Sequence, residues 1–324
     1  MRRGHRAPRR PPPHAQRGIA LLVAILLVAL GTILAAAIAY ENAMTFRRGA
    51  ATYAFDQALL VQEGAEALAA YGLRLAQKSD PQQTYASEGW AQPVGPFEVV
   101  PGVMLSAQLE DLQGRFNLNS LVKEDGTPDP VAVAAFQQLL AMLGLEPKWA
   151  GYMVDWIDRD IVPSVPDGAE DSVYMGQTPP YRTPNRYITS ASELLALPGF
   201  GRDHYVVLAP YVTALPYGVK LNVCTAKALV LDAFLGHGDF SSDVEGLARN
   251  RASANGCFPK LSDYQAAADS ATWSRISPKL QMTSSYFRLT SFITIGSTEF
   301  NLYSLLMQDP TGQVRPILRS YTPD

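Results

Sequence analysis

The residues best suited to chemistry in this sequence are the acids between Asp155 and Asp171, in the stretch DWIDRDIVPSVPDGAED. Six carboxylates fall within these seventeen residues, against a single arginine. Pro163 and Pro166 prevent a helix through the middle of the stretch, so the chain must form a loop that can bring carboxylates together. Hard cations such as calcium take about six to eight oxygen ligands from loops of this kind. Because the spacing is not that of an EF-hand, the residues alone leave two interpretations open, a cation site and a solvated acidic loop.

The sequence offers little for catalysis. It holds no Gly-x-Ser-x-Gly motif, no phosphate-binding loop and no HExxH motif. Of its four histidines, two lie among the first eighteen residues, and His204 and His237 stand far apart in the chain. We therefore predict that the protein is not an enzyme.

A different kind of binding is suggested by Glu193–Gly201, whose sequence ELLALPGFG resembles the hairpin of a helix-hairpin-helix motif. Such hairpins hold DNA phosphates by backbone N–H groups, and Asn222–Leu235 resembles the opening of a second unit. Phosphate affinity, however, comes mostly from lysine and arginine, and the nearby cations are Arg202 and Lys227. We predict no nucleic-acid binding, and a membrane-anchored DNA receptor of a competence-type system is the competing function.

The longest apolar stretch of the chain, from Ile19 to Ala39, has twenty-one residues and no charge. A helix of that length spans about 30 Å, the hydrocarbon thickness of a bilayer. The residues before it hold six arginines and no acid, so the N-terminus is expected to stay cytoplasmic and the chain beyond Tyr40 to lie across the membrane. The same residues also fit a plain signal anchor or a cleaved secretory signal peptide.

The charge of the chain depends on whether this basic segment is retained. The whole sequence has a formal net charge of −3, and removal of residues 1–18, with their six arginines, would leave −9. A chain this acidic is a poor candidate for binding DNA or an anionic membrane surface. The acid excess fits a cation-binding role better.

Beyond the apolar stretch, helices and strands are predicted in separate groups. Apolar residues recur at three- and four-residue steps from Phe46 to Leu75, which predicts a helix through residue 78 that ends before Pro81. We expect the second half of this helix to lay one face on a sheet, and residues 82–101 to form a loop. Alternation predicts strands at 103–109, 287–295, 300–304 and 314–321. Periodicity predicts helices between the strands, at 131–143, 149–157, 192–197 and 205–211.

The junction of Arg17 and Gly18 with the apolar stretch resembles a type IV prepilin leader, which a peptidase cuts after the glycine. The resemblance implies a mature chain that begins at Ile19, carries a methylated N-terminus and keeps the whole apolar helix. Most pilins and pseudopilins carry a glutamate at the fifth mature residue, where this chain has Val23. The pseudopilin type that lacks this acid is the K-type minor pseudopilin of type II secretion.

Two further stretches resemble the same K-type family. Glu110–Leu121, with the sequence EDLQGRFNLNSL, closely resembles one of its characteristic blocks, and the GAED and PPYR residues around the acidic cluster resemble another. The resemblance implies an α+β fold, in which a pilin-like long N-terminal helix packs on an antiparallel sheet and a large α-helical domain is inserted. The expected divisions are a leader at 1–18, a transmembrane or fibre-core helix at 19–40, a pilin-like helix and first strands at 41–125, the inserted helical domain at 126–213 and the remaining pilin-like domain at 214–324.

The function implied by this resemblance is that of a minor pseudopilin at the tip of the type II secretion pseudopilus, which initiates assembly and takes part in protein export. Expected partners are the I-type and J-type minor pseudopilins, the prepilin peptidase and exported proteins. The expected location is the inner membrane, with one span and a periplasmic globular part. K-type pseudopilins bind calcium, so the resemblance favours calcium in the acidic cluster, with ligands drawn from Asp158, Asp160, Asp167, Glu170 and Asp171.

The two cysteines, Cys224 and Cys257, would face an oxidising compartment in this location. A disulfide between them would close a loop of about thirty-four residues and stabilise the fold by about 3–4 kcal/mol in the chain-entropy model. Two isolated thiols are poor candidates for a metal site or for catalysis. We therefore expect them to form a structural disulfide.

Overall fold

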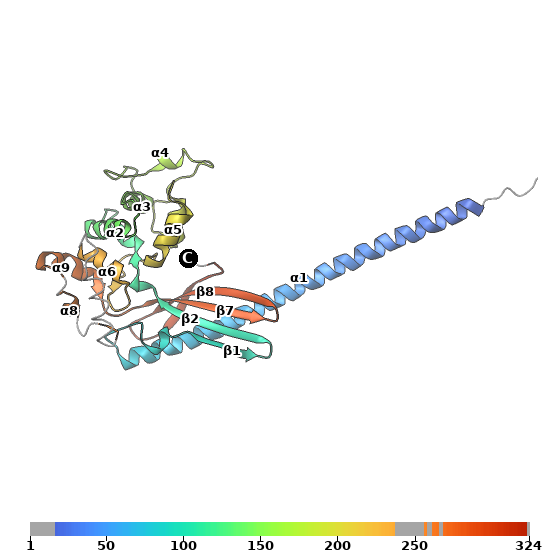
Figure 1. Cartoon of the computed structure of the whole chain (residues 1–324), viewed down its shortest axis with the longest axis horizontal. Coiled ribbons are helices and arrows are strands. Elements are labelled where there is room, and N and C mark those ends of the chain that lie inside the picture. Colours follow the sequence, from blue (N-terminus) through green and yellow to red (C-terminus); the bar gives the residue numbers. More distant parts are fainter. Residues whose placement is uncertain (1–16, 237–255, 258–260, 266–267, 323–324) are drawn as a thin grey trace, which may run out of the picture. The chain divides into compact units, whose positions relative to one another are not determined.

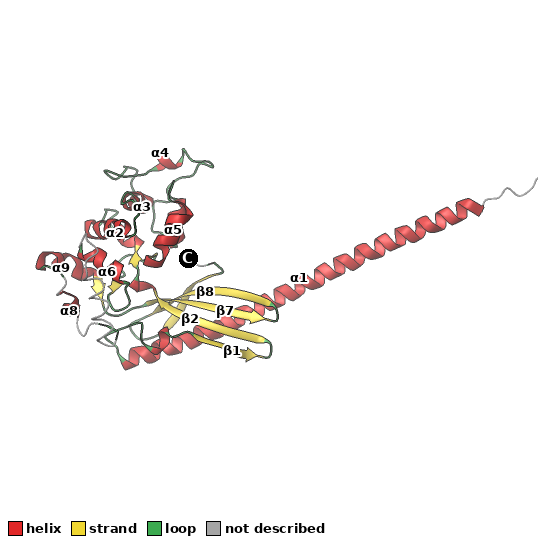
Figure 2. Cartoon of the chain, viewed as in Figure 1, coloured by secondary structure: helices red, strands yellow, loops and turns green. Residues whose placement is uncertain are grey.

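The computed structural model describes residues 17–236, 256–257, 261–265 and 268–322 of the chain (Figure 1). Residues 1–16 of the expected leader and His237 lie outside this part. The chain divides into two compact units, Met1–Gln57 and Ala58–Asp324. The described part of the first unit is helical throughout, whereas the second unit combines a sheet with several helices (Figure 2).

Helix α1 (Arg17–Ser79) contains the apolar stretch predicted from the sequence and continues beyond it without a break. By length and composition it is able to cross a membrane, and the side chains between Ile19 and Tyr40 are exposed. The helix ends before Asp80 and Pro81, as predicted, because proline cannot continue the hydrogen-bond pattern.

Within the second unit, α1 packs on the sheet through a face made mostly of small side chains. Its buried apolar residues are Ala58, Val61, Ala65, Ala69 and Leu73. The larger residues that the periodicity singled out lie elsewhere, since Leu60, Tyr71 and Leu75 are 57–69% exposed. The expectation that one face of this helix lies on a sheet is confirmed. The apolar residues singled out by the periodicity, however, lie on a different face, which is exposed.

A buried polar network also joins α1 to the sheet. The Glu66 carboxylate accepts hydrogen bonds from Arg319 Nε at 2.8 Å, Arg319 Nη2 at 2.7 Å and Ser304 Oγ at 2.6 Å. Gln62 Nε2 in turn donates to Ser304 Oγ at 2.8 Å. Because Glu66 is almost fully buried, its pairing with arginine satisfies a charge that would otherwise be costly.

The sheet has five antiparallel strands in the order β1-β2-β7-β8-β9. Leu105 on β2 lies opposite Ile293 on β7, and Leu289 on β7 lies opposite Ser304 on β8. The alternation predicted for these strands directs Leu105, Ile293 and their neighbours into one core with α1. The predicted loop at 82–101 is wrong in its second half, where β1 forms the edge of the sheet. The strands are β1 (Val94–Val100), β2 (Val103–Asp111), β7 (Tyr286–Ile295), β8 (Thr298–Gln308) and β9 (Val314–Ser320).

A helical region lies between β2 and β7 in the sequence, and Figure 1 shows its helices grouped together. Asp129 begins the first of them as an N-cap, with its side chain accepting from Val131 N and Ala132 N. The described helices are α2 (Pro130–Met142), α3 (Trp149–Ile157), α4 (Asp171–Tyr174), α5 (Gly201–Leu208), α6 (Ala228–Leu235), α8 (Leu261–Gln265) and α9 (Ser270–Ile276). The 3-10 turns are η1 (Gly89–Ala91), η2 (Leu112–Gly114), η3 (Leu118–Leu121), η4 (Ala191–Ala196), η5 (Ala209–Tyr211) and η6 (Ser277–Lys279), and the short strands are β3 (Phe116–Asn117), β4 (Val212–Thr213), β5 (Leu221–Asn222) and β6 (Leu280–Gln281).

One hydrophobic core serves this helical region. Its buried members reach from Phe116 to Leu280 in the sequence, and they include Phe136, Trp149 and Phe234. Two short parallel pairs, β3 with β4 and β5 with β6, join distant parts of the region. The core therefore includes residues on both sides of the expected domain boundaries, which lie between residues 125 and 126 and between residues 213 and 214. These boundaries remain predictions. The fold class is confirmed: a long N-terminal helix packs on an antiparallel sheet that is interrupted by a helical region.

Candidate metal centre

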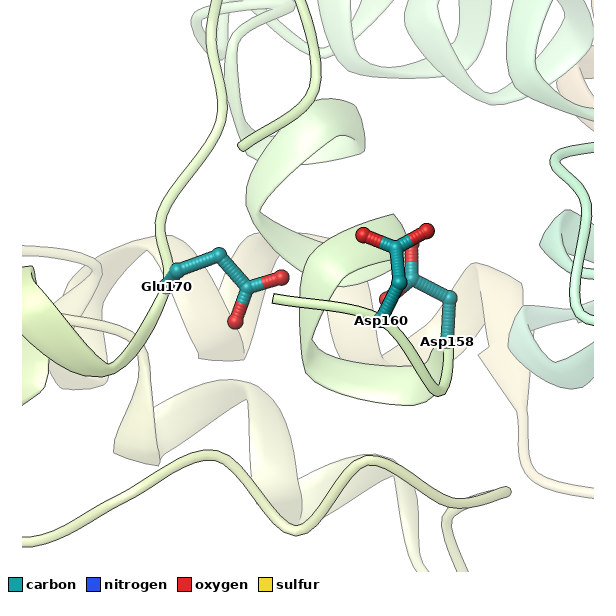
Figure 3. A group of neighbouring side chains, drawn as sticks. All are labelled: Asp158, Asp160 and Glu170. Atoms are coloured by element: carbon teal, nitrogen blue, oxygen red, sulfur yellow. The ribbon is translucent and has the colours of Figure 1, made fainter. Parts of the chain in front are cut away.

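Three carboxylates of the acidic stretch come together at the end of α3. Asp158 is the C-cap of that helix, and its extended backbone turns the chain so that Asp160 follows beside it. Glu170 is the N-cap of α4 and approaches from the other end of the loop. One oxygen from each of the three side chains lies within 4.8 Å of the other two. Figure 3 shows the Glu170 carboxylate directed toward the two aspartates.

The loop between these acids is held against α3 by a fourth carboxylate, that of Asp155. Ser164 N donates to both of its oxygens at 3.1 Å, and Ala169 N donates to Oδ2 at 2.7 Å. The sequence alone left open a solvated acidic loop, but the Asp155 side chain is fully buried. Gly151 is needed beneath the loop because a Cβ there would collide with the carbonyl oxygen of Asp167. Asp155 therefore positions the site, and its own oxygens are occupied by backbone donors.

The charge in this centre is uncompensated among the described residues. Asp158 and Glu170 are each 3% exposed. Asp158 Oδ1 and both Glu170 oxygens are buried and have no hydrogen-bond partner in the described part of the chain. Burial, reinforced by the neighbouring negative charges, raises the pKa of Asp158 to about 7 and the pKa of Glu170 to about 7. Isolated buried carboxylates are costly, and a bound cation would remove that cost.

Asp160 differs from its two neighbours because it is exposed. Its Oδ1 accepts a hydrogen bond from Val162 N at 2.7 Å, and Oδ2 takes no part in that bond. The three side chains together offer only carboxylate oxygens, the ligand type that hard cations prefer. Geometry, burial and donor chemistry thus all fit a metal ion at this cluster.

The other two predicted ligands lie outside this group of three. Asp167 is exposed. Asp171 Oδ1 accepts from Thr183 N and Thr183 Oγ1, each at 3.2 Å, and Asp171 Oδ2 lies 3.6 Å from Arg182 Nε. Their role as ligands remains a prediction.

One residue near the cluster carries a signal that the sequence reasoning did not use. Asn185 is the single described residue other than glycine with a positive φ, at 47°. Its Nδ2 donates to the backbone oxygen of Asp160 at 3.0 Å, whereas its Oδ1 is buried without a described partner. Asparagine tolerates this left-handed conformation better than most residues, so an Asn shortly after the PPYR block was the available hint.

The predicted cysteine pair lies away from the acidic cluster in sequence. Cys224 follows β5 and is joined to Cys257, with the two Cα atoms 4.6 Å apart. Both residues are buried in the core of the helical region. The link therefore ties residues 256–257 to that core.

The arrangement of a long apolar helix that continues onto an antiparallel sheet defines a pilin-like protein, here with an acidic centre in a helical region. Residues 114–217 match the family described as "Type II secretion system (T2SS), protein K". The chain is 32% identical over 315 residues to the type II secretion system protein K of Pseudomonas aeruginosa, covering 94% of this chain and 92% of that one. It is 33% identical over 306 residues to the protein of the same name from Klebsiella pneumoniae, covering 91% and 93%. The chain belongs to the type II secretion system protein K family.

A solved structure supports the fold. A chain of the crystal structure of the GspK-GspI-GspJ complex from the enterotoxigenic Escherichia coli type 2 secretion system aligns with a TM-score of 0.75. The alignment covers 86% of this chain and all of that one, at 24% sequence identity. The protein is accordingly a minor pseudopilin, a structural component rather than an enzyme. The family assignment also decides in favour of secretion over the competing DNA receptor.

Proposed function

We propose that this chain forms the tip of a type II secretion pseudopilus, initiates its assembly and takes part in protein export. The observation that carries the proposal is the match along nearly the whole chain to relatives named type II secretion system protein K. The residue at position 23 supports the tip position. Most pseudopilins carry a glutamate at this position, and its carboxylate pairs with the N-terminal amine of a neighbouring subunit. This pairing matters because an unpaired charge in an apolar fibre core costs several kcal/mol. With Val23, this subunit neutralises no amine ahead of it and so suits the first position.

The proposal includes processing and placement. A prepilin peptidase would cut between Gly18 and Ile19, and the new N-terminus would be methylated. The helix over 19–40 would anchor the protein once in the inner membrane, with residues beyond it in the periplasm; its length and apolar composition support this. The oxidising periplasm would maintain the Cys224–Cys257 link.

Partners are proposed from the same family relation. The solved complex contains GspI and GspJ, and we take the I-type and J-type minor pseudopilins as the partners of this chain. The exposed stripe of α1, formed by Leu60, Tyr71 and Leu75, gives them an apolar helix face on which to dock. Beside it lies a groove of about 690 Å³, whose lining includes Tyr71, Leu75, Trp90 and Val94. Exported proteins are further candidates for contact at the tip.

Calcium is the proposed occupant of the acidic centre, held by Asp158, Asp160 and Glu170. Calcium accepts flexible sets of oxygen ligands, and the three side chains offer only oxygens. The bound ion would supply positive charge to two buried carboxylates, and it would fasten the end of α3 to the start of α4. Its role is thus structural, in shaping the loop that separates the two helices.

The tip position is tested by Val23→Glu, with Val23→Gln as a polar control of similar size but without charge. We expect Val23→Glu to lower secretion and to alter pseudopilus number or length in cells that lack their own copy, and Val23→Gln to have a smaller effect. Normal secretion and normal pseudopili with Val23→Glu would contradict the assembly mechanism.

Processing is tested separately by mass spectrometry of the protein purified from its native host. The expected N-terminus is a methylated Ile19. A chain that starts at Met1, or downstream of residue 30, would rule out the prepilin route.

A further inference from the structure

The block EDLQGRFNLNSL carries a polar side chain at every second position from Asp111 to Asn119. The residues between these positions are buried and, apart from Gly114, apolar. Each of the polar side chains forms a hydrogen bond with a residue at least 69 positions further along the chain. The five are Asp111, Gln113, Arg115, Asn117 and Asn119. The block therefore joins segments that are distant in the sequence.

Two hydrophobic cores meet the block at different points. The core of α1 and the sheet includes Leu109, just before the block, whereas the core of the helical region includes Phe116, within it. No residue of the described part of the chain belongs to both cores. Two bodies without a shared apolar core are expected to move relative to each other. What holds them in one orientation must therefore be sought among directional contacts, and hydrogen bonds are directional.

Gln113 supplies such contacts between the sheet and the helical region. Its Nε2 donates to the backbone oxygen of Lys220 at 2.9 Å, just before β5. Its Oε1 accepts from Ser285 N at 2.6 Å and from Tyr286 N at 3.2 Å, where β7 begins. With an exposed fraction of 2%, the side chain is shielded from competing water. One amide thus fixes the start of β7 relative to the helical region.

Two more side chains of the block make the same connection. Asp111, the last residue of β2, accepts from Asn222 Nδ2 at 3.1 Å. Arg115 donates through Nε to Glu110 Oε1 on β2 at 3.0 Å, and through Nη1 to the Ala209 backbone oxygen in η5 at 3.1 Å. Together with Gln113 they give three separate polar connections between the strands and the helical region.

Asn119 offers a matched contrast to Gln113 because its bonds stay within the helical region. Its Nδ2 donates to the backbone oxygens of Ile188 at 2.9 Å and Leu215 at 2.8 Å, and its Oδ1 accepts from Ile188 N at 2.9 Å. Like Gln113, it is 2% exposed and takes part in three such bonds. The two amides differ in what they join.

We propose that Asp111, Gln113 and Arg115 fix the orientation of the helical region on the sheet, so that the two cores move as one body. This orientation is a property of the isolated chain and can be measured without secretion. Its consequence for the cell rests on the proposed function. At a pseudopilus tip, partners bound on α1 and on the helical region would stay at a constant distance from each other.

The test measures the distance between two spin labels by double electron–electron resonance, in the mature full-length chain in detergent. The labels are attached at Ala134→Cys on α2 and Thr298→Cys on β8, both exposed positions. Because Gln113→Ala loses directional bonds between the two bodies, we expect it to widen the distance distribution about twofold. Asn119→Ala, which loses bonds inside one body, should leave the width unchanged. Arg115→Met, which keeps an apolar stem, should widen the distribution less.

The outcomes separate an orienting role from a merely stabilising one. An unchanged width in Gln113→Ala, with a folded chain by near-ultraviolet circular dichroism, would overturn the inference. Equal widening in Asn119→Ala would also overturn it, since the labels would then report general loosening. If Gln113→Ala does not fold, the width in Arg115→Met decides. A widened distribution with normal secretion would support the orienting role and show that the tip function does not require it.

Discussion

Asp111 and the pair Asp158 and Glu170 are removed from solvent to nearly the same degree, with exposed fractions of 6% for Asp111 and 3% for each of the other two. Their surroundings differ. Asp111, at the end of β2, accepts hydrogen bonds from four donors: Gln113 N at 2.8 Å, Ser284 Oγ at 2.6 Å, Asn222 Nδ2 at 3.1 Å and Thr225 Oγ1. Of the four carboxylate oxygens of Asp158 and Glu170, three accept none from the described residues.

The comparison shows that burial alone does not distinguish a structural carboxylate from a binding one. Burial raises the pKa of Asp111 as it raises the pKa of Asp158 and Glu170. What separates the two centres is the number of donors supplied by the protein. Asp111 has a full set of neutral donors from chain segments that meet where the helical region leaves and rejoins the sheet. The acidic centre lacks donors, so its stability is expected to depend on a cation.

The largest effect is expected at Asp111. Asp111→Ala leaves several buried donors without an acceptor, at about 1–3 kcal/mol each, so we expect the free energy of unfolding to fall by about 3–4 kcal/mol. The loss should be the same in calcium and in chelator, as measured by denaturant unfolding of the mature chain in detergent. Asp111→Asn, which keeps one acceptor oxygen, should lose less. A loss that depends on calcium would mean that the two centres are not independent.

Substitutions in the acidic centre, in contrast to Asp111→Ala, should change the free energy of unfolding by an amount that depends on calcium. In Asp158→Asn/Glu170→Gln we expect the stabilisation by calcium to disappear, which amounts to about 2.7 kcal/mol at a free calcium concentration one hundred times the Kd. In chelator the double variant should be at least as stable as the wild type, because two unpaired buried charges are gone. Thermal unfolding with and without calcium measures both effects. If calcium raises the melting temperatures of variant and wild type equally, Asp158 and Glu170 are not calcium ligands.

The pH dependence without calcium should distinguish the centres further. The folded pKa values of Asp158 and Glu170, each about 7, lie above the ordinary values of about 3.9 and 4.3, so the folded state holds extra protons between these limits. Stability in chelator should therefore fall as the pH rises from about 5 to 8. In Asp158→Asn/Glu170→Gln the fall should be smaller, since of the carboxyl groups whose pKa values burial raises only Asp111, Asp155 and Glu88 remain among the described residues. Melting temperatures that follow the same pH profile in both proteins would contradict the assignment of these pKa values.

The sequence predicted the long helix, four strands of the five-stranded sheet and the place of the helical region, because each follows from a local period or a proline. It did not predict which face of α1 is buried. Two apolar faces share that helix, and the sheet contacts the one with Ala65 and Ala69, whose small side chains allow close approach, rather than the one with Tyr71.

The acidic stretch could be recognised from its composition, but the sequence did not show which acids cluster and which accept hydrogen bonds from the backbone. Asp155 is occupied by backbone donors nine and fourteen residues away, which no spacing rule reveals. Asp111 likewise depends on Asn222 and Ser284, more than a hundred residues distant in the sequence. Such assignments depend on contacts between distant segments, so they required the structure.

The smallest effect on calcium affinity is expected from substitution of Asp167, and this prediction tests which acids belong to the acidic centre. Its carboxylate is exposed, and its backbone oxygen lies so close to Gly151 that a Cβ there would collide with it. The group of three acids whose oxygens lie together in the described structure does not include Asp167. We therefore expect Asp167→Asn to change calcium affinity by no more than about twofold, which corresponds to about 0.4 kcal/mol. Asp160→Asn is the matched comparison, an equally small change at a residue within the cluster, and it should weaken binding about tenfold or more. If Asp167→Asn weakens binding as much as Asp160→Asn in calorimetry, the loop rearranges on binding and Asp167 joins the ligands.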